Sequence, residues 1–168
     1  MKLSIIIPMY NEQESLDALF MELSGLFSQE AKTEIIFIND GSSDDTLSIL
    51  ESKIKNYPSW KVINLYRNYG KSVALQAGFD NSKGEIIATM DADLQDNPKE
   101  IYNLIKELEK GYDVVSGWKK NRKDPLEKKI ASKIFNFFVR VFSGLKIHDS
   151  NCGIKVFKRE VTEMLTLY

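Results

Sequence analysis

The sequence predicts an α/β fold in which a mostly parallel sheet carries helices on both faces. Short runs of β-branched and other apolar residues alternate with longer segments whose apolar residues recur at helical spacing. Turn-forming residues such as Pro8, Gly84 and Gly111 separate these segments. The strand-then-helix order repeats four times, and strands joined through helices are normally parallel.

The expected strands are short, apolar and bounded by turn residues. They cover residues 3–8, 34–39, 61–65, 85–90, 113–116 and 154–157. The first is a nearly unbroken run of β-branched side chains that ends at Pro8. Such runs are typical of strands buried on both sides.

The expected helices follow the strands and cover residues 14–27, 44–57, 71–80 and 98–110. Ser42 or Ser43, ahead of two aspartates, is the expected start signal of the second helix. Pro98 suits the first turn of the fourth helix. A further helix is expected from Pro125, with an apolar stripe along it, and a helical turn from Arg159.

Length and composition indicate one soluble globular domain over residues 1–168. Hydrophobic residues make up 43% and charged residues 28% of the chain, which excludes a disordered class. No run approaches the roughly 20 apolar residues that span a bilayer, and no signal-peptide pattern opens the chain. Cys152 is the single cysteine, so a cytoplasmic location is expected. The pattern stops abruptly at Tyr168, from which we expect a longer natural chain.

Charge divides the chain into two parts. Residues 1–118 hold 11 basic and 19 acidic side chains, a net charge of −8, whereas residues 119–168 hold 12 basic and 5 acidic side chains, a net charge of +7. The division predicts that the second part meets an anionic partner. The alternative is a solvated basic helix face.

The stretch 130–142 combines phenylalanines with flanking Lys and Arg side chains. A helix of this kind can lie in a membrane surface, at the inner face of the membrane for a cytoplasmic protein. The alternative, which the pattern favours for most of these residues, is packing against the sheet.

Chemistry is expected where strands end, because ligands of parallel α/β sheets bind at the carboxyl ends of the strands. Asp91 and Asp93 follow the fourth strand, and residues two apart in an extended segment point the same way. Two such carboxylates can bind one hard cation, Mg²⁺ or Mn²⁺, with Gln95 or Asp96 nearby. The alternative reading is a pair of turn aspartates, one of which caps the helix after Pro98.

The first two strands also end in polar residues. Tyr10 can stack on a base and Glu12 can bind a ribose hydroxyl, unless this loop only initiates a helix. Asp40, beside Gly41, can accept hydrogen bonds from a base or ribose. The alternative for Asp40 is a helix cap and turn, which the local pattern favours.

Four further residues carry side chains with possible chemistry. Lys71 follows a glycine, but Leu65 stands where a phosphate loop needs another glycine, so Lys71 is a candidate phosphate contact only through its helix N-terminus. Asp149 is a candidate general base. Cys152 is expected to be a small buried residue, and the lone His148 to be structural.

The ordered motifs resemble glycosyltransferase family 2, in the branch of dolichol-phosphate mannosyltransferases and bacterial undecaprenyl-phosphate sugar transferases. The similar segments are IIIPMYNE at 5–12, NDGSSD at 39–44, NYGK at 68–71, MDADLQDNP at 90–98, SGW at 116–118 and DSNCG at 149–153. They follow one another over nearly the whole chain.

The resemblance implies a GT-A fold and inverting transfer from a nucleotide-diphosphate sugar. It implies that Pro8, Tyr10, Glu12 and Asp40 hold the nucleoside. Asp91, Asp93 and Gln95 would hold the diphosphate through Mg²⁺ or Mn²⁺. A polyprenyl-phosphate acceptor would meet basic residues in the region of Lys119, Arg122 and Lys133.

Two other functions remain open at this point. One is transfer to a soluble glycan or polysaccharide, and the other is a catalytically silent nucleotide-binding module. The sequence argues against a receiver-like module, because Met9-Tyr10 and Tyr66-Arg67 stand where its acidic residues are required. No nucleic-acid partner is expected, and a homo-oligomer is compatible with the sequence, which fixes neither the base nor the sugar.

Overall fold

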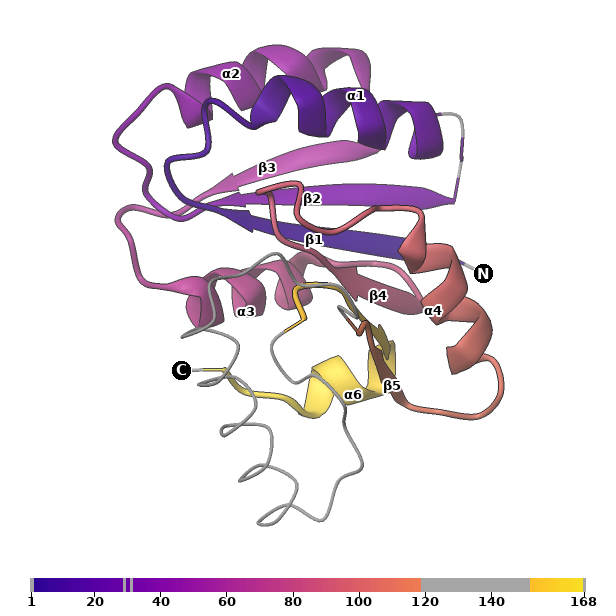
Figure 1. Cartoon of the computed structure of the whole chain (residues 1–168). Coiled ribbons are helices and arrows are strands. Elements are labelled where there is room, and N and C mark those ends of the chain that lie inside the picture. Colours follow the sequence, from indigo (N-terminus) through magenta and orange to yellow (C-terminus); the bar gives the residue numbers. More distant parts are fainter. Residues whose placement is uncertain (1, 29, 31, 119–151, 168) are drawn as a thin grey trace, which may run out of the picture.

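The computed structural model describes residues 2–28, 30, 32–118 and 152–167, which form a sheet covered by helices on both sides (Figure 1). The strands are β1 (Leu3–Met9), β2 (Thr33–Asn39), β3 (Trp60–Asn64), β4 (Ile86–Thr89), β5 (Val114–Ser116) and β6 (Lys155–Lys158). The helices are α1 (Leu16–Phe27), α2 (Thr46–Lys53), the short 3-10 helix η1 (Ile54–Asn56), α3 (Lys71–Asn81), α4 (Glu100–Leu108) and α6 (Arg159–Met164).

The sheet has the strand order β3-β2-β1-β4-β6-β5. β1 pairs in parallel with β2 and β4, and β2 with β3, which confirms the predicted mostly parallel α/β sheet. β6 is antiparallel to both of its neighbours, β4 and β5. The residues just before β6 therefore lie at the same edge of the sheet as the carboxyl end of β4.

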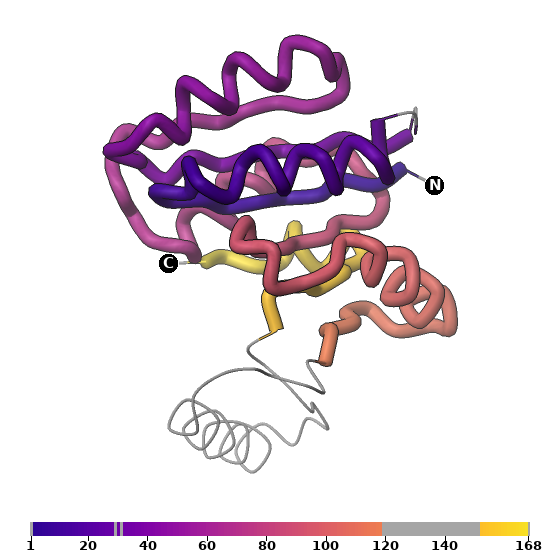
Figure 2. Tube along the Cα trace, turned by 45° about the horizontal axis from the view of Figure 1, so that its top comes forward, coloured from indigo at the N-terminus to yellow at the C-terminus, as the bar shows by residue number. Residues whose placement is uncertain are grey.

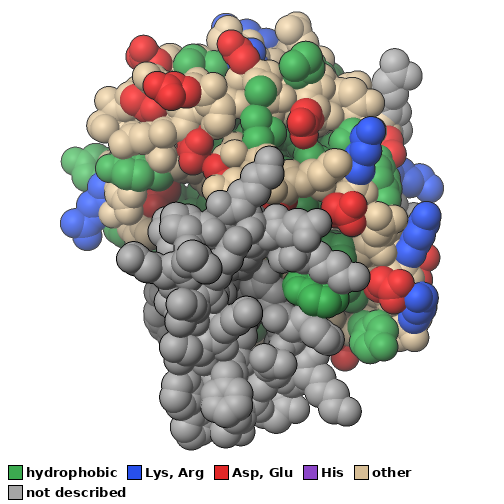
Figure 3. Space-filling view, viewed as in Figure 1, with side chains coloured by type: hydrophobic (Ala, Val, Ile, Leu, Met, Phe, Trp, Pro, Cys, Tyr) green, Lys and Arg blue, Asp and Glu red, His purple; other side chains and the backbone are tan. Residues whose placement is uncertain are grey.

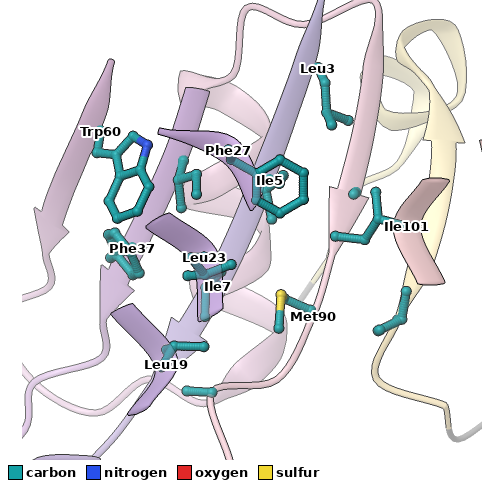
Figure 4. Close-up of a cluster of buried hydrophobic side chains, with 14 of the residues drawn as sticks. Leu3, Ile5, Ile7, Leu19, Leu23, Phe27, Phe37, Trp60, Met90 and Ile101 are labelled. Atoms are coloured by element: carbon teal, nitrogen blue, oxygen red, sulfur yellow. The ribbon is translucent and has the colours of Figure 1, made fainter. Parts of the chain in front are cut away.

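Burial on both faces explains the unbroken apolar runs. Ile5 and Ile7 of β1 pack into the core under α1, α2 and α4, whereas Ile6 packs into the core under α3 and α6. All three side chains are fully buried. Figure 4 shows the first core, in which Leu19, Leu23 and Phe27 of α1 lie over β1 and β2.

The helix that follows β2 begins later than the sequence predicts. α2 starts at Thr46 rather than at residue 44, and its last turn becomes η1. Ser42 and Ser43, the predicted start signal, do not cap the helix, because their side chains bond Asn11 in the loop after β1. The other described helices and strands overlap the predicted ranges to within a few residues.

The predicted helix from Pro125, including the stretch 130–142, lies outside the described residues. Among the helices that are described, none has the length and apolar character that crossing a bilayer requires.

Candidate functional site

A cavity of about 300 Å³ opens at the carboxyl edge of the sheet. The loops after β1, β2 and β3 gather at this edge in both views (Figure 1, Figure 2). The cavity is lined by Pro8, Met9, Tyr10, Glu12, Asp40, Asn68, Gly70, Lys71, Ala74, Asp91, Ala92 and Asp93. Four separate strand ends thus supply one concave site, as the α/β pattern predicts.

The loop after β1 is held by side chains of the loop after β2. Ser42 Oγ accepts a hydrogen bond from the Asn11 amide at 2.9 Å, and Thr46 Oγ1 accepts one from the Glu12 amide at 2.9 Å. Asp44 Oδ2 accepts a third, from the Gln13 amide at 3.2 Å. Three consecutive backbone N–H groups at the rim of the cavity are therefore satisfied.

The same two loops are also bonded in the opposite direction. Asn11 Oδ1 accepts a hydrogen bond from the Ser43 amide at 2.9 Å, and Gln13 Oε1 accepts one from the Asp45 amide at 3.0 Å. Asn11 adopts a positive φ of 56°, a conformation that asparagine tolerates better than most residues. Reciprocal bonding fixes the first two loops as one unit, which we call the loop clasp.

Asp40 organises the loop after β3. Its side chain accepts hydrogen bonds from the amides of Tyr69, at 2.8 Å, and Gly70, at 2.9 Å. Gly41, at a φ of 64°, lets this loop pass closely, because a Cβ there would lie 2.3 Å from the Arg67 carbonyl carbon. The helix-cap part of the alternative for Asp40 is wrong, because α2 is preceded by Asp45 and the Asp40 side chain bonds the loop after β3 instead.

Tyr10 and Glu12 both reach the cavity, as the sequence predicts. Tyr10 is 46% exposed, so it is accessible to a stacking partner. Glu12 also contributes to helix initiation, because its Oε2 accepts a hydrogen bond from Ser15 Oγ at 2.8 Å. The two readings of this loop are therefore compatible.

Asp91 and Asp93 line the same cavity, although β4 ends at Thr89 and residues 92–94 form a bend rather than an extended segment. Lys71, at the first position of α3, forms an ion pair with Asp91 Oδ1. Asp93 Oδ1 accepts a hydrogen bond from the Gln95 amide at 3.1 Å, which forms a local turn. Gln95 itself is exposed and does not line the cavity.

The donor set fits a hard divalent cation. Two carboxylates face the cavity, and a cationic ammonium already lies against one of them. Within the described ranges, no cluster of three or more His, Cys, Asp or Glu side chains could hold a metal by itself, so further ligands would come from water or a bound diphosphate. The alternative that one of these aspartates caps the next helix is wrong, because α4 has no side-chain cap.

Some expectations fall outside the described residues, and some lining residues were not predicted. Lys119, Arg122, Lys133, His148 and Asp149 all lie in the range 119–151, which the structure does not describe. Cys152 is buried, as expected. The unpredicted lining residues are Met9, Asn68, Gly70, Ala74 and Ala92. Met9 ends β1 and Ala74 lies on α3, whereas Asn68, Gly70 and Ala92 lie in the loops after β3 and β4, and that position is the signal that could have found them.

Comparison with known proteins identifies the family. The model of "Glycosyl transferase family 2" matches residues 4–166. A dodecaprenyl-phosphate galacturonate synthase of Rhizobium johnstonii is 35% identical over 99% of this chain and 51% of its own length. An undecaprenyl-phosphate 4-deoxy-4-formamido-L-arabinose transferase of Serratia proteamaculans is 39% identical over 98% of this chain and 51% of its own length.

Solved structures show the fold independently. A mannosyltransferase from Pyrobaculum calidifontis, in complex with GDP-Man and Mn²⁺, matches with a TM-score of 0.73 at 22% identity, over 99% of this chain and 47% of that one. A glucosyl-3-phosphoglycerate synthase from Mycobacterium tuberculosis, with Mn²⁺ and UDP-glucose, matches with a TM-score of 0.74 at 19% identity. This match covers 99% of the present chain and 59% of the synthase chain. The predicted Rossmann-like GT-A architecture is confirmed.

The present chain spans about half the length of the curated relatives it matches. The match nevertheless includes every described strand and all four loops that line the cavity. The chain therefore belongs to glycosyl transferase family 2.

Proposed function

We propose that this protein transfers a sugar from a nucleotide-diphosphate donor to a polyprenyl-phosphate acceptor, with inversion at the anomeric carbon. The observation that carries the proposal is the convergence, in one cavity, of Tyr10, Asp40, Lys71, Asp91 and Asp93 from four strand ends. An aromatic ring, a basic side chain and a carboxylate pair are the groups needed for a base, a diphosphate and its cation.

The relatives support this choice of substrates. Both curated relatives are named for sugar transfer or synthesis on a polyprenyl phosphate, and both are more than 30% identical to this chain. The two solved neighbours hold a nucleotide sugar together with Mn²⁺. We extend these properties to the present chain as a proposal, with Mg²⁺ or Mn²⁺ as the cofactor.

In the reaction, an oxygen of the acceptor phosphate attacks the anomeric carbon while the bond from that carbon to the donor diphosphate breaks. Asp91 and Asp93 would hold the divalent cation, which would supply positive charge to the departing nucleoside diphosphate. Lys71 places a further positive charge at the same wall of the cavity. Asp40 keeps the loop at Tyr69 and Gly70 in place against the donor.

The acceptor side rests on residues outside the described ranges. A lipid phosphate is already ionised near neutral pH, so it requires cationic positioning more than deprotonation. We assign this task to Lys119, Arg122 and Lys133, and we place the protein at a membrane surface. Asp149 is the proposed base if the acceptor is instead a hydroxyl.

The decisive experiment removes either carboxylate of the proposed metal site. We expect Asp91→Ala and Asp93→Ala each to reduce Mn²⁺-dependent donor turnover by at least about a hundredfold, because leaving-group charge is no longer balanced. Asp80→Ala, an exposed aspartate on α3 away from the cavity, is the matched control. Wild-type rates in both variants would contradict the site assignment.

The same assay separates the rival acceptors. Turnover is compared with polyprenyl phosphate and with free glycans, using UDP- and GDP-sugars in turn. Transfer to glycan alone would replace the lipid acceptor, and nucleotide-dependent thermal stabilisation without any turnover would indicate a silent binding module.

A further inference from the structure

The antiparallel strand β6 places Gly153 at the carboxyl edge of the sheet, where the cavity opens. β6 pairs with β4 so that Lys155 lies opposite Thr89, and continuing this register by two residues places Gly153 opposite Asp91. Thr89 Oγ1 donates a hydrogen bond to the Gly153 carbonyl at 3.4 Å across the same pair of strands. Gly153 is buried and therefore forms part of the wall behind the carboxylate pair.

The Asp91 carboxylate lies in the space where a side chain of residue 153 would be. A Cβ on Gly153 would be 2.6 Å from Asp91 Oδ2 and 2.8 Å from Asp91 Cγ, which is closer than real Cβ atoms approach. It would also be 2.9 Å from Asp96 Oδ2. Two carboxylates therefore converge on the bare backbone of Gly153.

The backbone at Gly153 is not free to retreat. On one side, Thr89 bonds its carbonyl. On the other, the Gly117 amide donates to the Ile154 carbonyl at 3.0 Å, and Lys155 Nζ donates to the Cys152 carbonyl at 2.8 Å. A methyl group added at residue 153 must therefore be accommodated by the two aspartates.

Backbone conformation gives no reason for a glycine at this position. The glycines with positive φ among the described residues are Gly41, Gly70 and Gly111, and Gly153 is not one of them. A positive φ is therefore not what requires glycine at this position. What the glycine provides is room for Asp91.

We propose that Gly153 is a positioning residue, whose missing side chain sets the place of the Asp91 carboxylate in the donor cavity. Asp91 has two oxygens: one faces Gly153 and the other pairs with Lys71. A side chain at 153 turns this carboxylate and moves both oxygens together. The inference rests on the proposed function, in which Asp91 binds the cation.

The test measures binding of Mn²⁺ alone to the 168-residue chain by electron paramagnetic resonance. We expect Gly153→Ala to weaken Mn²⁺ binding by about ten- to a hundredfold, the usual effect of disturbing residues that orient metal ligands. The matched control is Gly117→Ala, in which the added methyl group lies against Cys152 Sγ instead of the Asp91 carboxylate. Gly25→Ala, with no atom near its added methyl, controls for the substitution itself.

Wild-type Mn²⁺ affinity in Gly153→Ala would overturn the inference, and so would an equal loss in Gly117→Ala. If the wild-type chain itself binds no Mn²⁺, the metal part of the proposed function fails, and the inference is judged by a crystal structure of Gly153→Ala. A displaced Asp91 carboxylate that no longer pairs with Lys71 supports it. An unmoved Asp91–Lys71 pair refutes it.

Discussion

At the scale of single residues, Glu34 shows how a buried charge is stabilised far from the cavity, at the amino end of the strands. Its Oε1 accepts hydrogen bonds from Ser4 Oγ and the Lys83 amide, both at 2.6 Å, and Lys61 Nζ lies 3.3 Å from Oε2. Burial alone raises the pKa of this carboxyl, but the Ser4, Lys83 and Lys61 interactions outweigh it, and the net pKa is lowered from 4.5.

This lowered pKa predicts how Glu34 contributes to stability as pH changes. Because the folded pKa lies below the unfolded value, the contribution is full above about pH 4.5 and is lost as pH falls through the folded pKa. We expect Glu34→Gln to lower the free energy of unfolding by about 1–3 kcal/mol at pH 7.

Urea unfolding at pH 7 and at pH 3 measures this difference, with Glu22→Gln as an exposed control on α1. The difference in the free energy of unfolding between wild type and Glu34→Gln should be smaller at pH 3 than at pH 7. A gap that stays constant or widens would show that the Glu34 charge is not what stabilises this network.

At the scale of elements, the packing around a helix decides whether its glycine can be replaced by alanine without loss of stability. A Cβ on Gly78 of α3 would lie 2.3 Å from Ile6 Cγ2, and Ile6 is fully buried. Gly25 of α1 has no atom within 4 Å of the same position. The two helical glycines therefore differ in the atoms that surround their Cβ positions.

We therefore expect opposite effects from the same substitution. Gly25→Ala should raise the free energy of unfolding by about 0.5–1 kcal/mol through helix propensity. Gly78→Ala should lower it by about 1–3 kcal/mol, because α3 must move away from the sheet. Thermal or urea unfolding measures both, and stabilisation by Gly78→Ala would mean that α3 is not held tightly against Ile6.

At the scale of the whole molecule, periodicity and strand order predicted the architecture because they reflect burial. The run at residues 3–8 is apolar throughout because β1 is covered on both faces, and the loops after the strands meet because parallel strands end at one edge. Strand order made Tyr10, Glu12, Asp40, Asp91 and Asp93 candidates at this edge, and the structure brings them together with Lys71 in one cavity.

The rest depends on contacts that no local pattern encodes. The loop clasp joins residues about thirty positions apart, and the Asp40 side chain bonds amides equally distant. The insertion of β6 between β4 and β5 depends on long-range pairing, so the place of Gly153 behind Asp91 could not be read from its own segment. The predicted start of α2 was wrong for the same reason, because side chains of the loop before α2 bond the neighbouring loop instead of starting the helix.

Charge separation at this scale predicts how the acceptor is recognised. Acidic side chains are dispersed over the face seen in Figure 3, whereas most basic residues of the last third lie in the range 119–151. Replacing Lys119, Arg122 and Lys133 together by alanine should raise the KM for polyprenyl phosphate at least about tenfold, because charge-assisted contacts to phosphate are lost. Donor hydrolysis without acceptor should change by less than about twofold, since those contacts are not made to the donor.

Replacing the exposed Lys2, Lys55 and Lys106 removes equal charge elsewhere and should leave the KM for polyprenyl phosphate unchanged. Steady-state kinetics at low and high salt measures both constants, and equal losses in transfer and hydrolysis would remove these three residues from the acceptor site.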